Sequence, residues 1–129
     1  MALSASGLPD RGVAGSPAID RSVLGEWLAG DDAAIDELLA VFRDSVQAEF
    51  VRMRDLLALG QLNEYANAAH RMRGAALSMG ARALAEFIGL LYAAARADDK
   101  GACVNGMPVL ETHIQLMAAE VPAGPSDSL

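Results

Sequence analysis

The sequence predicts an all-α protein, an antiparallel up-and-down four-helix bundle with a short extra helix at its N-terminal end. Apolar residues recur at spacings of three and four along most of the chain, which is typical of the buried face of a helix. No alternating run of β-branched residues is long enough to predict a strand. Only 5% of the residues are aromatic, while alanine, leucine and methionine are common, so we expect an aliphatic core.

The chain length of 129 residues fits one domain, because it is enough to bury a single core. We expect the bundle over residues 17–121. Residues 1–16 and 122–129 are rich in small residues and proline and have no apolar periodicity, so we expect both tails to be disordered.

The first helix is expected over residues 19–28 and ends at Gly30, and its Trp27 is expected to cover one end of the bundle. The acidic residues after Gly30 suit the start of the second helix. The second helix keeps one apolar stripe up to Gly60 and is about 27 residues long. Its stripe contains Ile35, Leu38, Leu39, Phe42, Val46, Phe50, Met53 and Leu57.

Three further helices are expected over residues 61–79, 81–97 and 107–121, and the short connections favour antiparallel neighbours. Gly80 lies where a left-handed cap would end the first of them. Pro108 either starts the last helix or kinks it, because proline has no N–H to donate inside a helix. The inner faces are predicted to contain Leu62, Tyr65, Ala66, Ala69, Met72, Ala76 and Met79, then Leu84, Phe87, Ile88, Leu91 and Ala95, and then Met107, Leu110, Ile114, Met117 and Val121.

One histidine, His70, interrupts an alanine-rich part of the helix expected over residues 61–79. At about 100° of rotation per residue, His70 falls roughly 130° from the centre of the apolar stripe and therefore faces outward. Arg73 and Gly74 share its face, as does Asn67 one turn earlier. A glycine inside a helix costs about 1 kcal/mol relative to alanine, and one reason for it here is to keep side-chain bulk away from the imidazole.

Most lone surface histidines have no chemical role, but this combination of residues suits one. The imidazole is a nucleophile, the Arg73 cation can neutralise an oxyanion, and Gly74 leaves the surface open. An unperturbed histidine side chain has a pKa of about 6.5, so a neutral imidazole is available near pH 7. The pattern predicts a site that carries a phosphoryl group on an imidazole nitrogen.

A longer pattern surrounds the histidine. It consists of His70, Arg71, Met72, Arg73 and Gly74, followed by Gly80, Ala81 and Leu84. This pattern resembles H-x-L-K-G-x-x-x-x-x-G-A-x-x-L of the histidine-containing phosphotransfer (HPt) domain family. Residues 38–70 resemble the family's second helix and the turn before its histidine helix, so the resemblance covers about residues 18–120. It implies an HPt-like bundle that acts in a bacterial phosphorelay, accepting a phosphoryl group from an aspartate of one receiver domain and passing it to an aspartate of another.

Within this resemblance, His70 aligns with the phosphorylated histidine, Arg73 with the usual lysine, and Gly74 with the glycine beside it. Met72 replaces a leucine, which keeps the side-chain volume and should be a mild change. Arginine keeps the charge of lysine but presents a planar fork, so we expect transfer to persist with a different rate or partner preference.

The docking surface for a partner is expected on the outward face around His70, formed by the second and third helices. We expect Asn67, Arg71 and Leu77 to contact the partner, and the position of Leu77 fits a core-boundary residue equally well. Five arginines lie in this part of the chain and form either a solvated face or a surface complementary to an acidic receiver pocket. They are Arg52, Arg54, Arg71, Arg73 and Arg82.

The resemblance implies response regulator receiver domains and a hybrid histidine kinase as partners, with Mg²⁺ on the receiver domain and no cofactor on this chain. The sequence has no glycine-rich nucleotide loop, so we expect no ATP-binding kinase domain. A net charge of -7 argues against nucleic acid binding, and no apolar run approaches the ~20 residues that span a bilayer. We expect a cytoplasmic monomer.

Two other functions remain open. One is a helical docking or regulatory module that binds receiver domains without phosphotransfer, against which the presence of His70 counts. The other is the phosphoacceptor part of a dimeric sensor kinase, whose motif would place an acidic residue where this chain has Arg71. His113 is expected at the surface, and Cys103 in a loop or at a helix start.

Overall fold

The computed structural model describes residues 17–122, and in this range it contains five α-helices and no strand. Of the tails predicted to be disordered, 1–16 and 122–129, all residues except Pro122 lie outside the described residues. The helices are α2 (Arg21–Trp27), α3 (Asp32–Ala58), α4 (Leu62–Ser78), α5 (Arg82–Arg96) and α6 (Lys100–Ala118). The predicted all-α fold class is confirmed.

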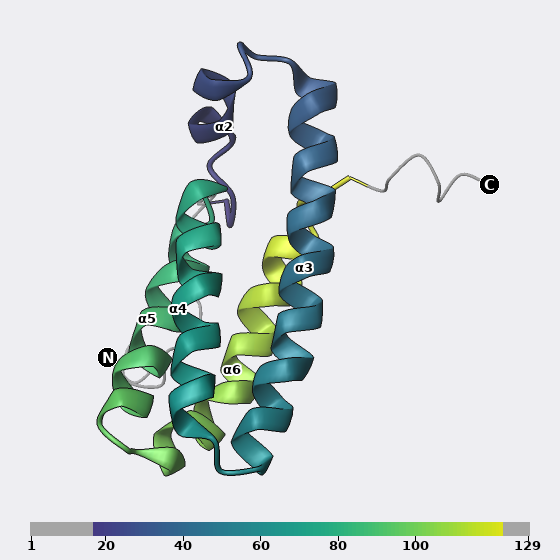
Figure 1. Ribbon diagram of the computed structural model, residues 1–129. Coiled ribbons are helices and arrows are strands. Elements are labelled where there is room, and N and C mark those ends of the chain that lie inside the picture. The colour runs from purple at the N-terminus through teal and green to yellow at the C-terminus, as the bar shows by residue number, and fades with distance from the viewer. Residues whose placement is uncertain (1–16, 123–129) are drawn as a thin grey trace, which may run out of the picture.

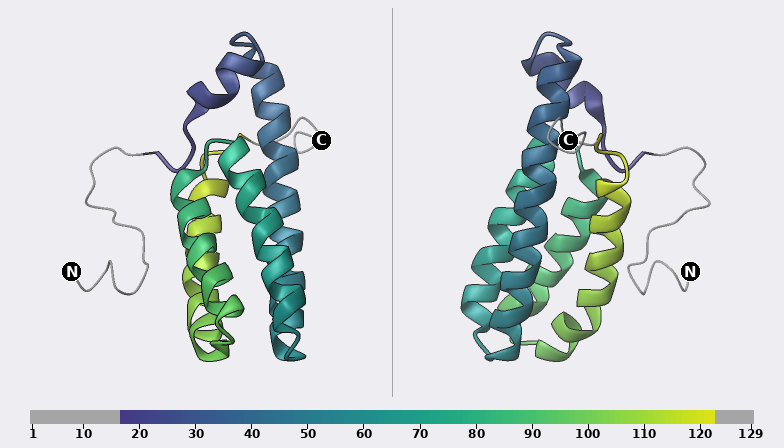
Figure 2. Two further views of the ribbon diagram at one scale, coloured as in Figure 1. Left: turned by 60° about the vertical axis from the view of Figure 1, so that its left-hand side comes forward. Right: turned by 90° about the vertical axis from the view of Figure 1, so that its right-hand side faces the viewer.

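Helices α3 to α6 form an antiparallel bundle in which α3 packs on α4, α4 on α5, α5 on α6 and α6 back on α3 (Figure 1). The N-terminal part of α3 extends beyond the other three helices, as the views in Figure 2 also show. The short α2 lies beside this extension and contacts α3. The predicted four-helix bundle with an extra N-terminal helix is therefore the observed architecture.

Hydrogen bonds donated by backbone N–H groups attach the segment before α2 to the bundle. The N–H of Asp20 donates to the carbonyl oxygen of Gly80 at 2.8 Å. The N–H groups of Ala18 and Ile19 donate to the Glu120 carboxylate at 2.6 and 2.9 Å. Gly80 has φ +78, as the predicted left-handed cap requires, and a Cβ there would overlap the Asp20 carbonyl. Glycine at this position serves both the turn and the approach of the N-terminal segment.

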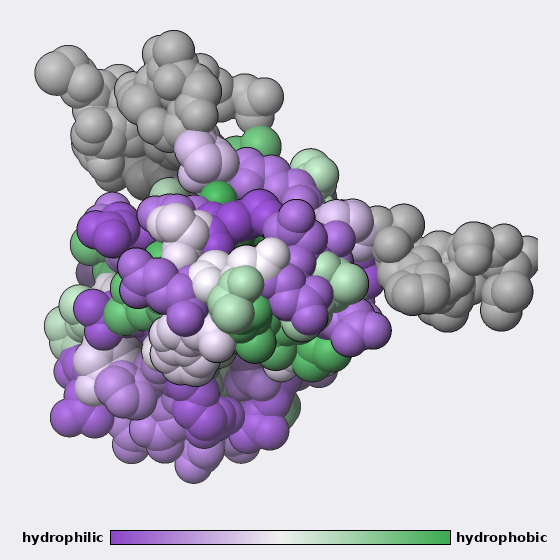
Figure 3. All heavy atoms as spheres, turned by 90° about the horizontal axis from the view of Figure 1, so that it is seen from above, coloured by the Kyte–Doolittle hydropathy of each residue, from purple (hydrophilic) through white to green (hydrophobic). Residues whose placement is uncertain are grey.

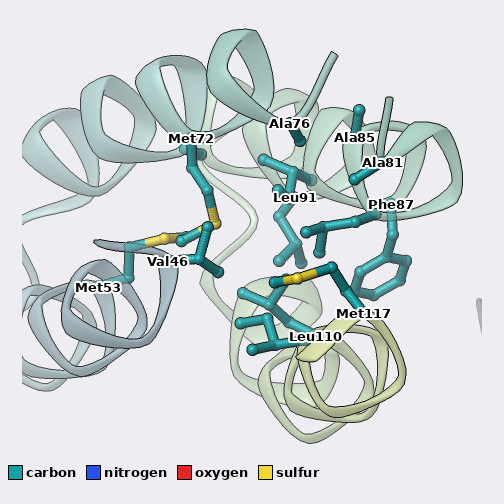
Figure 4. Packing of buried hydrophobic residues seen from close by; sticks show 14 of the residues in the cluster. Val46, Met53, Met72, Ala76, Ala81, Ala85, Phe87, Leu91, Leu110 and Met117 are labelled. Carbon is teal, nitrogen blue, oxygen red and sulfur yellow. The ribbon is translucent and has the colours of Figure 1, made fainter. Parts of the chain in front are cut away.

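The core is aliphatic, as predicted. Met72 of α4 points toward Val46 and Met53 of α3 (Figure 4). Helices α5 and α6 approach closely at Gly106, where a Cβ would lie only 2.5 Å from Cδ2 of Leu91. Every predicted inner residue of α5 is buried. The inner residues predicted for the last helix, between residues 107 and 121, are all buried as well. Leu38, Phe50, Leu62 and Met79 are only partly buried.

Trp27 does not cover an end of the bundle, and this prediction is wrong. Its side chain is 71% exposed, whereas Leu24 of the same helix is fully buried. Because α2 has only seven residues, it offers one buried position, and Leu24 occupies it. Seen from the α2 end, the surface is mostly hydrophilic, with hydrophobic residues scattered among hydrophilic ones (Figure 3).

The last helix begins earlier than predicted, at Lys100. Asp99 caps it by accepting a hydrogen bond from the N–H of Ala102, so of the two alternatives for Pro108, a helix start is excluded. Pro108 therefore lies inside α6, where it leaves the carbonyl of Val104 without its usual intrahelical donor.

Two residues of α6 are more buried than their sequence context indicated. His113 is only 7% exposed and stacks on Phe87 with ring centroids 5.1 Å apart, so the surface prediction is wrong. Its spacing of three from Leu110 and four from Met117 already placed it on the inner face. Cys103 lies in the first turn of α6, as one alternative predicted, and is fully buried.

Among residues 17–122, no helix has the length and apolar character needed to cross a membrane.

Candidate functional site

Helix α4 separates an inner face from an outer face at the positions that the sequence predicted. Its buried residues are Tyr65, Ala66, Ala68, Ala69, Met72 and Ala76. His70 is exposed, as are Arg73 and Gly74 three and four residues later. The outward orientation predicted for His70 is confirmed.

The side chain of His70 is directed toward α5. Its imidazole ring contacts the phenol ring of Tyr92, with centroids 5.6 Å apart and an interplanar angle of 42°. Tyr92 is half-buried, so it provides a fixed surface for the imidazole while leaving the other side of His70 accessible. The surface expected from α3 and α4 alone was therefore incomplete, because the ring nearest to His70 belongs to α5.

Arg73 extends over the same neighbouring helix. Its Cδ and Nε lie 3.6 and 3.2 Å from the point where a Cβ of Gly89 would be. No carboxylate of the described residues lies within ion-pair distance of its guanidinium. A cation beside an exposed imidazole, without an internal counterion, is available to an anionic group that approaches His70.

Two other arginines of the basic region, Arg52 and Arg71, pair with a carboxylate on the α3 side. Arg71 pairs with Glu49 of α3 at 3.4 Å, and Arg52 approaches the same carboxylate at 4.0 Å. These pairs are exposed, so they contribute little to stability, but they neutralise part of the charge on the α3 side. The interpretation as a solvated face fits Arg52 and Arg71 better than it fits Arg73.

Gly74 lies in open surroundings. A Cβ at this position would meet nothing within 4 Å, and its φ is not in the left-handed region. Neither backbone conformation nor packing within the described chain therefore requires glycine at position 74. Gly25 in α2 has the same open surroundings, so the absence of contacts alone does not mark a site.

Asn67 and Leu77 are exposed on α4. Leu77 has 45% of its surface exposed, which favours the exposed position over the core-boundary alternative. With Arg71 also exposed, all three residues predicted to contact a partner are accessible, and the contact itself stays a prediction.

Small side chains allow α4 and α5 to approach closely enough for these contacts. Ala76, Ala81 and Ala85 are buried at one end of this pair of helices (Figure 4). Because alanine adds only a methyl group, the two backbones can lie near each other. The antiparallel register then places Tyr92 opposite His70 and, three residues back, Gly89 opposite Arg73.

Sequence reasoning missed Tyr92 and Gly89. Gly89 carried a detectable signal, since like Gly74 it lies inside a predicted helix and lowers helix propensity. Apart from its position next to the predicted core residue Leu91, Tyr92 carried no signal in the sequence. Its contact with His70 depends on the register between α4 and α5.

The buried polar groups of the bundle are not candidates for chemistry. Burial raises the pKa of Tyr65, and the nearby Cys103 raises it further, while the Tyr65 hydroxyl donates to Sδ of Met107 at 3.3 Å. Burial likewise raises the pKa of the Cys103 thiol, which disfavours the reactive thiolate. No group of three or more metal-ligating side chains occurs in the part of the chain that the structure describes.

Comparison with known protein families gives one match. The sequence model of the Hpt domain matches residues 37–121, which is more than half of the chain and extends from α3 through α6. The matched range contains His70, Arg73, Gly74, Gly89 and Tyr92. No match was found among curated proteins or among solved structures.

Proposed function

The chain belongs to the Hpt domain family, and on this basis we propose that it carries a phosphoryl group on His70 between the aspartates of two receiver domains. Hpt domains are phosphocarrier modules of two-component systems and interact with receiver domains and kinases in phosphorelays. What is proposed for this chain is the acceptor residue, the roles of its neighbours and the route of the phosphoryl group.

The observation that carries the proposal is the grouping of three properties on one face of α4. His70 is exposed, the Arg73 guanidinium has no internal counterion among the described residues, and Gly74 leaves the space beside them empty. The chain has only two histidines, and the other, His113, is buried against Phe87. A partner that docks on the surface therefore has one accessible imidazole to react with.

The transfer step needs a nucleophile and a stabilised anion. A lone pair of the neutral His70 imidazole attacks the phosphorus of an aspartyl phosphate, and a new N–P bond forms. The P–O bond to aspartate breaks, its electron pair leaves with the carboxylate, and the imidazole N–H stays on the other ring nitrogen. The reverse sequence delivers the phosphoryl group to the next aspartate. Arg73 contributes charge-assisted hydrogen bonds to the phosphoryl oxygens.

In this scheme the carrier itself needs few functional groups for phosphoryl transfer. We propose that the chain binds no cofactor of its own and that Mg²⁺ is held by the receiver domain, where it neutralises phosphoryl charge. Asn67, Arg71 and Leu77 would contact the receiver around His70. The upstream donor would be the receiver domain of a hybrid histidine kinase.

The decisive experiment compares wild type with His70→Gln. Each protein is mixed with a receiver domain that has been phosphorylated on aspartate, and phosphate on the carrier is measured together with its stability in acid and base. We expect base-stable, acid-labile phosphate on wild type and none on His70→Gln. Equal labelling of both proteins would show that His70 is not the acceptor, and receiver binding without any labelling would favour the docking module that lacks phosphotransfer.

A further inference from the structure

We infer that Gly89 of α5 is a positioning residue for Arg73, holding its guanidinium on the face that contains His70. The inference rests on the proposed phosphocarrier function and extends it to a residue of the neighbouring helix. Gly89 does not contact the phosphoryl group in this scheme, and it acts only through Arg73.

The contact between the two residues is specific. If Gly89 carried a Cβ, only two atoms would lie within 4 Å of it outside its own helix and chain neighbours, and both belong to Arg73. They are Nε at 3.2 Å and Cδ at 3.6 Å. The arginine stem therefore passes directly over the position that a side chain would occupy, at a distance shorter than an ordinary van der Waals contact for Nε.

Other reasons for glycine at position 89 are not supported. Its φ is not in the left-handed region, so the backbone does not need glycine. No backbone atom of α4 lies within 4 Å of a Cβ there, so close packing of the two helices does not need it either. Glycine is a poor helix former, and Gly89 lies in the interior of α5. What the missing side chain accommodates is Arg73.

The chemistry of arginine explains why this space matters. A lysine in place of Arg73 would end in a compact ammonium on a flexible stem, whereas arginine ends in a planar guanidinium whose orientation decides which atoms it can bind. Resting the stem on Gly89 restricts that orientation before a phosphoryl group arrives. Since Tyr92, three residues further along α5, contacts His70, one helix positions both the nucleophile and the cation.

The test uses phosphoramidate as the phosphoryl donor, because this small molecule reaches His70 without docking of a receiver. The imidazole lone pair attacks phosphorus, the P–N bond of phosphoramidate breaks, and ammonia leaves with that electron pair. Phosphorylation of the full chain is followed over time by intact-protein mass spectrometry at neutral pH, with His70→Gln as the blank. The variants are Gly89→Ala, Gly89→Leu, Arg73→Ala and the double variant Arg73→Ala with Gly89→Leu.

Arg73→Ala is expected to slow labelling on the order of tenfold, because it removes charge-assisted hydrogen bonds to the phosphoryl oxygens. Gly89→Leu should approach that slow rate, and Gly89→Ala should slow labelling less. Thermal unfolding should show Gly89→Ala to be at least as stable as wild type, because alanine is the better helix former. A variant that gains stability and loses rate is not explained by a purely structural role. Gly25→Ala is the matched control, with unchanged rate.

The double variant separates positioning from simple obstruction. If Gly89 acts through Arg73, then Gly89→Leu has no further effect once Arg73 is alanine. Equal slowing by Gly89→Leu in both backgrounds would overturn the inference, as would a wild-type rate for Gly89→Leu when Arg73→Ala is slow. If His70→Gln is labelled as fast as wild type, the proposed function itself fails, which is a different result from either of these.

Discussion

The imidazole of His70 in α4 and the phenol of Tyr92 in α5 form a tilted ring pair with centroids 5.6 Å apart. The pair joins the exposed imidazole of the site to α5, a helix that lies outside the docking surface predicted from the second and third helices. A ring contact of this kind limits the rotamers of the imidazole and so fixes the direction from which phosphorus is attacked.

Replacing Tyr92 should therefore change the rate of labelling at His70. Ring contacts are worth about 0.5–1.5 kcal/mol, so Tyr92→Ala is expected to slow phosphorylation by phosphoramidate about two- to tenfold. Tyr92→Phe keeps the ring and should react like wild type. If Tyr92→Phe were as slow as Tyr92→Ala, the hydroxyl rather than the ring would be the group that matters.

Substitutions at Gly74 should change the free energy of unfolding and the binding of a receiver domain independently of each other. Gly74→Ala is expected to raise the free energy of unfolding by up to about 1 kcal/mol, because a Cβ there meets nothing and alanine is the better helix former. Gly74→Leu should weaken binding of a receiver domain while leaving phosphoramidate labelling unchanged, since only the large donor needs the open surface. Urea unfolding and titration with a receiver measure the two effects. Unchanged receiver binding by Gly74→Leu would make this glycine incidental, and Gly25→Ala controls for helix propensity alone.

Gly80→Ala should destabilise the fold. The residue has φ +78, and a Cβ would overlap the Asp20 carbonyl, so we expect a loss of about 2 kcal/mol or more in urea unfolding. Gly60→Ala is a matched control, because Gly60 has φ +73 but no atom within 4 Å of a Cβ. The difference between the two variants measures the contact with the N-terminal segment. Equal losses would show that the approach of Asp20 contributes nothing.

Stability should fall in alkaline solution, and Tyr65 should account for part of the fall. The pKa of Tyr65 is raised in the folded state from its ordinary value of 10.0, mainly by burial, so the folded chain retains a proton that the unfolded chain loses. The contribution of Tyr65 to the free energy of unfolding is complete below pH 10.0 and is lost progressively above it. The raised pKa of Cys103 adds a similar loss of stability from about pH 9. Tyr65→Phe should flatten the dependence of unfolding free energy on pH above 10, measured by urea unfolding. An identical slope for Tyr65→Phe and wild type would contradict the assignment.

Much of the fold was predictable because the signals are local. The apolar stripes of α3 and α5 recur every three to four residues, so the inner face follows from helix geometry without knowledge of any neighbour. The same geometry placed His70 on the outer face, and the glycine at position 80 indicated the left-handed turn. His113 shows a local signal that was overlooked, since its spacing matches the buried residues of α6.

By itself, then, the sequence determined which residues of α4 face outward and that His70, Arg73 and Gly74 share that face. Only the tertiary structure decided that Arg71 pairs with Glu49 on one side while His70 meets Tyr92 and Arg73 crosses Gly89 on the other. The physical reason is that helix periodicity fixes a direction around one axis, whereas contacts between helices depend on their rotation and register. Those are set by the packing of many small buried side chains together, here the alanines between α4 and α5, and no single segment of the chain encodes them.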